Sequence, residues 1–154
     1  MNIQQRPYAI DQLRALVSNE WIPGEQGFEI YPDAVPRFRS MVDPLRNMNA
    51  IGRDDRAPGP LLLGYIPAMR PRRHVNGWWG PGREIEYDQC KLREPVRARN
   101  RIHLLERCQE AVRGQNGFIL TFEHKIVVAD SQKTALEVRI HWFHQFGSPG
   151  IEID

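Results

Sequence analysis

Residues 118–146 read FILTFEHKIVVADSQKTALEVRIHWFHQF, and this stretch decides the fold. Apolar and polar residues alternate on both sides of a short polar segment at 130–133. Alternation with a period of two is typical of a β-strand that buries one face. We therefore expect two long strands, 118–128 and 134–146, joined as an antiparallel hairpin. A helix capped by Ser131 is the competing interpretation of the second segment, but its Val, Ile, Trp and Phe residues favour a strand.

Outside the hairpin, the sequence predicts both helices and strands. Pro95 is a good first residue for a helix that runs to Arg113 and ends at Gly114. Two more helices are expected over 8–20 and from Asp33 towards Gly52, the latter with a kink or restart at Asp43. Shorter strands are expected over 27–31, 61–66 and 83–91. The predicted fold class is α+β, with a mostly antiparallel sheet of four to five strands and about three helices packed on one face.

The length and composition are those of one globular domain. A chain of 154 residues fits a single domain over 1–154, with a flexible loop at 67–82 and a peripheral tail at 148–154. No apolar run approaches the ~20 residues of a membrane span, so no membrane partner is expected. We expect a cytoplasmic protein in which both cysteines are reduced thiols.

The charge distribution permits an anionic partner. The formal net charge is +2, and the basic residues comprise 18 Arg and 3 Lys. Residues 69–113 carry a local charge of +5 (11 basic, 6 acidic), whereas residues 114–154 carry −2 (3 basic, 5 acidic). Guanidinium groups favour planar, bidentate contacts with carboxylates and phosphates.

The most distinctive segment is the predicted loop. Its candidate binding residues are Arg70, Arg72, Arg73, His74, Trp78 and Trp79, with basic support from Arg97 and Arg101. Arginines grip phosphates and indoles stack on bases, so the leading hypothesis is a non-enzymatic binding or accessory protein that recognises a nucleic acid or an acidic protein surface. In the simpler alternative, the tryptophans anchor the loop on the core and the arginines are solvated or paired.

A second hypothesis is a metal-dependent hydrolase or nuclease. Glu84, Glu86 and Asp88 alternate on one predicted strand and would share one face. With Glu123 and Lys125 they would form a carboxylate cluster that holds a divalent metal, beside a lysine that orients water. Glu123 and Lys125 are the candidate catalytic residues, and this metal is the candidate cofactor. The alternative is a solvated face paired with arginines.

A third hypothesis is a self-associating structural subunit. Trp78, Trp79 and an exposed strand edge would then form the interface of a homo-oligomer. A metal triad of Glu137, His141 and His144 would require a helix over 134–146. The predicted strand places His141 and His144 on opposite faces, which argues against that triad.

Overall fold

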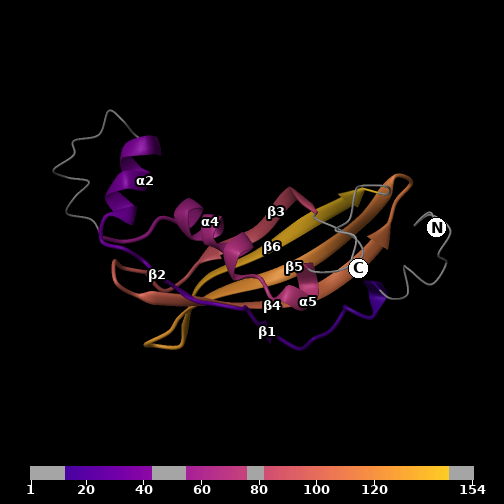
Figure 1. The fold of residues 1–154 in the computed structure, drawn as a ribbon, viewed down its shortest axis with the longest axis horizontal. Helices are drawn as coiled ribbons and strands as arrows, with labels where there is room; N and C mark the ends of the chain where they lie inside the picture. Colours follow the sequence, from indigo (N-terminus) through magenta and orange to yellow (C-terminus); the bar gives the residue numbers. More distant parts are fainter. Residues whose placement is uncertain (1–12, 43–54, 76–81, 146–154) are drawn as a thin grey trace, which may run out of the picture.

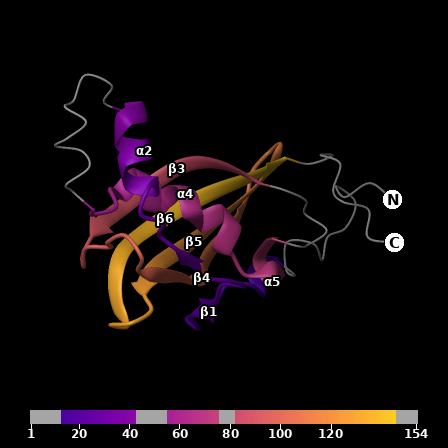
Figure 2. The ribbon, with the colours of Figure 1, turned by 60° about the vertical axis from the view of Figure 1, so that its left-hand side comes forward.

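The computed structural model describes residues 13–42, 55–75 and 82–145, which form a curved antiparallel sheet with few helices (Figure 1). In chain order the elements are β1 (Ile22–Pro23), β2 (Phe28–Glu29), α2 (Ala34–Val42), α4 (Gly59–Met69), α5 (Arg72–Val75), β3 (Arg83–Leu92), β4 (Arg101–Arg113), β5 (Gly117–Val128) and β6 (Lys133–Gln145). The strand order is β1-β4-β5-β6-β3, and β2 also pairs with β4. Figure 2 shows the long strands curving around α4, with α2 projecting from the end of the sheet.

The predicted hairpin is confirmed and lies in the middle of the sheet. Strands β5 and β6 pair antiparallel, with Phe122 opposite Ile140. The even-numbered side chains over 118–128 and 136–144 are buried, and Leu120 and Ile126 belong to one core cluster with the apolar residues of α4. We call this the inner face of the sheet and the opposite one the outer face.

The predicted helix over 95–113 is wrong, because most of this segment is strand β4. Ile102, Leu104 and Cys108 alternate on the inner face and are buried. Glu106 occupies the inward position between Leu104 and Cys108, and its charge hides the period of two in the sequence. Strand β4 pairs with β5 over its whole length, with one register shift between Cys108 and Glu110.

The predicted strand over 61–66 is also wrong, because these residues lie in α4. Pro60 occupies the first turn, where its missing N–H costs nothing. Leu62, Ile66 and Met69 are buried at helical spacing and pack in the core with the inner face of the sheet. The run was misleading because its apolar residues surround the helix almost completely and show no clear period.

The remaining expectations divide between confirmed and corrected. Strands appear at Phe28–Glu29 and Arg83–Leu92 as predicted, and α2 follows Asp33. The helix predicted over 8–20 does not reach Glu20, because Val17 forms a β-bridge with Cys108. Part of the predicted 67–82 loop is helical, namely the end of α4 and α5. The restart at Asp43, the tail at 148–154 and loop residues 76–81 lie outside the described residues.

The expected α+β class with an antiparallel sheet is therefore confirmed, but the sheet has six strands rather than four or five. The helices that the structure describes are α2, α4 and α5, and α5 has only four residues. None of the described helices is long and apolar enough to cross a membrane.

Two glycine substitutions test the corrected helix. Gly64 is an exposed residue inside α4, and a Cβ there would meet nothing within 4 Å. We expect Gly64→Ala to raise the free energy of unfolding by about 0.5–1 kcal/mol through helix propensity. Gly24→Ala should lower it, because a Cβ there would collide with the Met69 carbonyl oxygen. Urea unfolding measures both, and a Gly64→Ala protein that is less stable would contradict the helix.

Candidate functional site

A fully buried carboxylate organises the inner face. Glu106 of β4 has no exposed surface, and Arg70 donates from Nε to Oε1 at 2.7 Å and from Nη2 to Oε2 at 3.3 Å. His74 Nδ1 in α5 lies 2.6 Å from Oε2. His124, opposite Glu106 on β5, places Nδ1 2.9 Å from Oε1, a close electrostatic contact rather than an aligned hydrogen bond. We call these four residues the Glu106 cluster.

The surroundings of Glu106 fix its protonation. Burial alone would raise its pKa, but the charge of Arg70 and the close contacts with His124 and His74 outweigh burial and hold the pKa far below the ordinary range. Glu106 is therefore a carboxylate at neutral pH and cannot act as a proton donor. Burial lowers the pKa of His124, although Glu106 opposes this shift, so His124 tends to stay neutral.

The end of α4 brings Arg70 and His74 to this carboxylate. Arg70 follows the helix directly, and its guanidinium lies between two aromatic rings, 4.6 Å from the Phe122 centroid and 4.3 Å from the Trp142 centroid. The short helix α5 then places the His74 ring 4.9 Å from Phe122. Arg70 and His74 thus share one buried, low-dielectric environment with the Glu106 carboxylate.

Glu84 and Tyr87 of β3 complete the inner face on the other side of Trp142. Glu84 lies opposite Trp142 in the register, and Tyr87 donates its hydroxyl to Glu84 Oε2. Partial burial raises the pKa of Glu84, while the charge of Arg70 opposes the rise. Perturbed carboxyl groups of this kind are frequent at functional sites. The inner face therefore holds two candidate proton-transfer groups, His74 and Glu84, on the two sides of Arg70.

Burial disfavours the reactive thiolate form of the cysteine beside this cluster. Cys108 neighbours Glu106 on the inner face of β4, and burial raises the pKa of its thiol to about 12. A thiol that stays protonated is a poor nucleophile.

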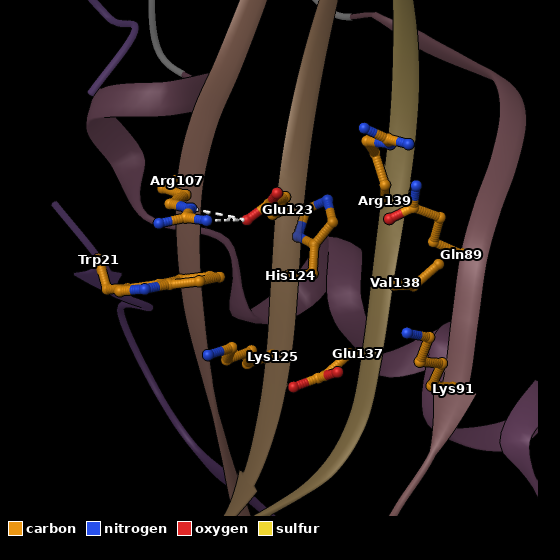
Figure 3. A pocket seen from close by; sticks show the side chains of 10 residues that line it. All are labelled: Trp21, Gln89, Lys91, Arg107, Glu123, His124, Lys125, Glu137, Val138 and Arg139. Atoms are coloured by element: carbon orange, nitrogen blue, oxygen red, sulfur yellow. Dashed lines mark hydrogen bonds and ion pairs between the residues drawn. The ribbon is translucent and has the colours of Figure 1, made fainter. Parts of the chain in front are cut away.

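The outer face carries a different arrangement, a pocket of about 180 Å³ above β4, β5 and β6 (Figure 3). The Trp21 indole lies between Arg107 and Lys125, each with its charged group 4.4 Å from the ring centre. Arg107 is also paired with Glu123 at 2.6 Å. The candidate catalytic residues Glu123 and Lys125 therefore share a face as predicted, but Glu123 already has a cationic partner.

Charges alternate across this outer face. In the register, Arg107, Glu123, Arg139 and Asp88 form one cross-strand row, and Lys125, Glu137 and Lys91 form the next. Opposite charges on neighbouring strands are favourable pairs. The row explains why so many charges fit on one sheet surface.

The predicted carboxylate ladder is divided between the two faces. A register shift between Glu84 and Glu86 turns Glu84 to the inner face and leaves Glu86 and Asp88 on the outer one. Candidate ligand atoms of Glu86, Asp88 and His141 lie within 4.8 Å of one another. Arg139 holds both oxygens of Asp88 at 3.1 Å, which satisfies that carboxylate without a metal. A divalent metal remains a prediction; of its three candidate ligands the structure brings together Glu86 and Asp88, beside His141, but not Glu84.

The predicted binding residues do not form one surface. Arg70 and His74 are buried on Glu106, whereas Arg72 lies on the surface beside Glu25. Arg73 is exposed, Arg97 pairs with Asp55 at 2.7 Å, and Arg101 is exposed at the start of β4; Trp78 and Trp79 lie outside the described residues.

The residue that sequence reasoning missed is Glu106, and the signal available was its place in the alternation of Ile102, Leu104 and Cys108.

Known proteins share the fold rather than the sequence. No protein-family model matches the chain, and no curated protein resembles it in sequence. A MaoC-like dehydratase from Rhodospirillum rubrum superimposes with a TM-score of 0.66 at 11% identity, over 88% of this chain and 97% of that chain. The HadBC 3R-hydroxyacyl-ACP dehydratase complex from Mycobacterium tuberculosis gives 0.57 at 13% identity, over 83% and 98%. A hypothetical thioesterase with coenzyme A from Streptococcus pneumoniae gives 0.54 at 7% identity, over 90% and 98%.

These similarities correct the functional interpretation. The hypothesis of a non-enzymatic protein that binds nucleic acid or an acidic protein surface is wrong, because the structural neighbours include two dehydratases and a thioesterase. The structure also removes its basis, since Arg70 and His74 point into the core instead of towards a partner. The chain has a hotdog-like fold, an antiparallel sheet of six strands with α4 on its inner face.

Replacing Glu106 tests the charge balance of the cluster. Glu106→Gln leaves Arg70 buried without its counter-ion, and breaking such a pair costs about 3–5 kcal/mol of unfolding free energy. The matched control is Glu123→Gln, which breaks the partly exposed pair with Arg107 and should cost about 0–1 kcal/mol. Chemical denaturation of both proteins measures the difference. Equal losses would mean that the cluster does not balance charge as described.

His124 should make stability pH-dependent. Its pKa is lowered in the folded protein, so the unfolded chain binds the proton first as the pH falls below its ordinary value of about 6.5. The free energy of unfolding should therefore fall below that pH, by at most about 1.4 kcal/mol per pH unit for one proton. His124→Asn keeps a donor near Glu106 and should flatten this part of the profile. An unchanged profile would contradict the assignment.

Proposed function

We propose that this chain is an acid–base enzyme acting on acyl thioesters, in the class of dehydratases and hydratases. The observation that carries the proposal is His74, a histidine held by the buried carboxylate of Glu106 on the inner face of the sheet. The fold supports it, because a MaoC-like dehydratase and a hydroxyacyl-ACP dehydratase share it.

The protonation of Glu106 determines which nitrogen of His74 can react. An ionised carboxylate only accepts hydrogen bonds, so Nδ1 of His74 carries the proton that points to Oε2. Nε2 then has the free lone pair and serves as the base. Glu106 also stabilises the imidazolium that forms when Nε2 takes a proton. Arg70 keeps Glu106 ionised, so it acts as a positioning residue.

The reaction needs a base and an acid. In dehydration, Nε2 of His74 removes the proton from C2 of a 3-hydroxyacyl thioester, and the electron pair forms the C2–C3 double bond. The C3–O bond breaks, and the hydroxyl leaves as water with a proton from an acid. Glu84 has the raised pKa that suits such an acid, and Tyr87 fixes its position. Hydration is the same path in reverse.

We further propose that the protein works as a homo-oligomer. Its structural neighbours include the HadBC 3R-hydroxyacyl-ACP dehydratase complex. Among the described residues, β3 pairs only with β6, which leaves one edge of this strand unpaired. The exposed apolar side chains Ile85, Tyr87 and Leu92 lie on the same strand. A cytoplasmic location and a single domain remain predictions from the sequence.

Hydration of a short trans-2-enoyl-CoA, followed by the loss of its ultraviolet absorbance, tests the function. His74→Asn keeps the donor to Glu106 but removes the basic Nε2, and we expect kcat to fall by about 10²- to 10⁴-fold. The matched control is His103→Asn, the same change on the outer face of β4, which should leave kcat unchanged. Full activity of the His74→Asn protein would exclude His74 as the base. Hydrolysis of acyl-CoA without any hydration would replace the dehydratase assignment with a thioesterase.

A further inference from the structure

The Trp142 indole presents a hydrogen-bond donor that the described residues leave unused. Its Nε1 is sealed from solvent and has no acceptor among the described residues. A buried indole N–H usually finds a partner, and leaving it unsatisfied is unfavourable. An inward-facing donor that lacks an acceptor is a place where a ligand oxygen gains a full hydrogen bond.

Arg70 supplies a second donor beside the first. Its guanidinium carbon lies 4.3 Å from the centre of the Trp142 ring, so the two groups are immediate neighbours. Nε and Nη2 bind Glu106, whereas Nη1 takes part in none of the hydrogen bonds found among the described residues. The guanidinium of Arg70 therefore stacks on the indole of Trp142, which is itself paired with Glu84 of β3.

The neighbouring charges select the kind of oxygen that fits. The positive charge of Arg70 attracts a negatively charged ligand atom, but Glu106 already neutralises most of the charge of Arg70. Glu84 lies opposite Trp142 and repels a full anion whenever it is ionised. This balance disfavours phosphates and carboxylates. It favours a neutral carbonyl oxygen that gains negative charge only during a reaction.

We infer that Trp142 Nε1 and Arg70 Nη1 bind the carbonyl oxygen of the thioester and stabilise the enolate that forms when C2 loses its proton. This inference rests on the proposed function and names the oxygen-binding residues of the same site. Donors aligned on a developing oxyanion in a site that excludes water stabilise the transition state more than the ground state. Trp142 then acts mainly on kcat, because the bond strengthens as the enolate forms.

The test compares two coenzyme A derivatives that differ at one atom group. Butyryl-CoA has the thioester carbonyl, whereas S-butyl-CoA is a thioether without it. The indole ¹H–¹⁵N signals of the full chain are followed by NMR during titration with each. The Trp142 signal, assigned by its loss in Trp142→Phe, should shift downfield with butyryl-CoA and stay in place with S-butyl-CoA. The Trp21→Phe protein, changed on the outer face, is the control and should respond as the wild type does.

Kinetics provide the second measurement. Trp142→Phe keeps an aromatic ring against Arg70 and removes the N–H, so kcat should fall by about 10²- to 10³-fold while KM changes little. Trp21→Phe should change neither. If Trp142→Phe does not fold, the wild-type titration with the two derivatives still decides, with the signal assigned by replacing the other tryptophans.

The outcomes separate this inference from the proposed function. If butyryl-CoA binds without moving the Trp142 signal while His74-dependent hydration occurs, the oxygen site is wrong and the function stands. If the signal moves only with the thioester but His74→Asn changes no activity, the oxygen site stands and the acid–base assignment fails. If neither derivative binds at millimolar concentration, both proposals fail.

Discussion

The structure depends on the balance of charge between Arg70 and Glu106 inside the sheet. A buried carboxylate is costly unless it is paired and hydrogen-bonded, and Glu106 obtains its partners from three separate elements. Arg70 fixes the end of α4, His74 fixes α5, and His124 joins β5 to β4 through side chains. Losing Arg70 or His124 would remove an interaction that keeps Glu106 ionised, so the folding and the chemistry of this cluster are coupled.

The two faces of the sheet use charge in opposite ways. On the inner face a few charges lie in a low-dielectric environment beside Phe122 and Trp142, where each contact has a large effect. On the outer face many charges pair in solvent, where each pair contributes little. The pocket beside Trp21 lies on this outer face, where Arg107 pairs with Glu123 and opposite charges face each other across the strands. The inner face is the better candidate for catalysis because it holds the base His74 and the indole N–H of Trp142, which has no acceptor among the described residues.

The sequence allowed some elements to be predicted and concealed others for identifiable reasons. The hairpin of β5 and β6 was predictable because its inward positions are almost all apolar. Strand β4 was not, because an inward position holds Glu106 and an outward one holds Leu105. Helix α4 was missed because the apolar run at 61–63 has no period. The charges of Arg70 and His74 mark them as candidate binding residues in the sequence. Their role follows instead from their burial against Glu106, and only the three-dimensional structure shows that burial.

The alternating rows on the outer face also specify how the strands align. A slip of one residue would exchange the two faces, so the smallest slip that keeps the core buried is two residues. Such a slip between β5 and β6 would place Glu123 opposite Glu137, or Lys125 opposite Arg139, instead of the opposite charges that now face each other. Like charges in direct opposition are unfavourable. The charge pattern on the outer face thus specifies the register of the hairpin, because it disfavours shifted pairings that the apolar inner face alone would allow.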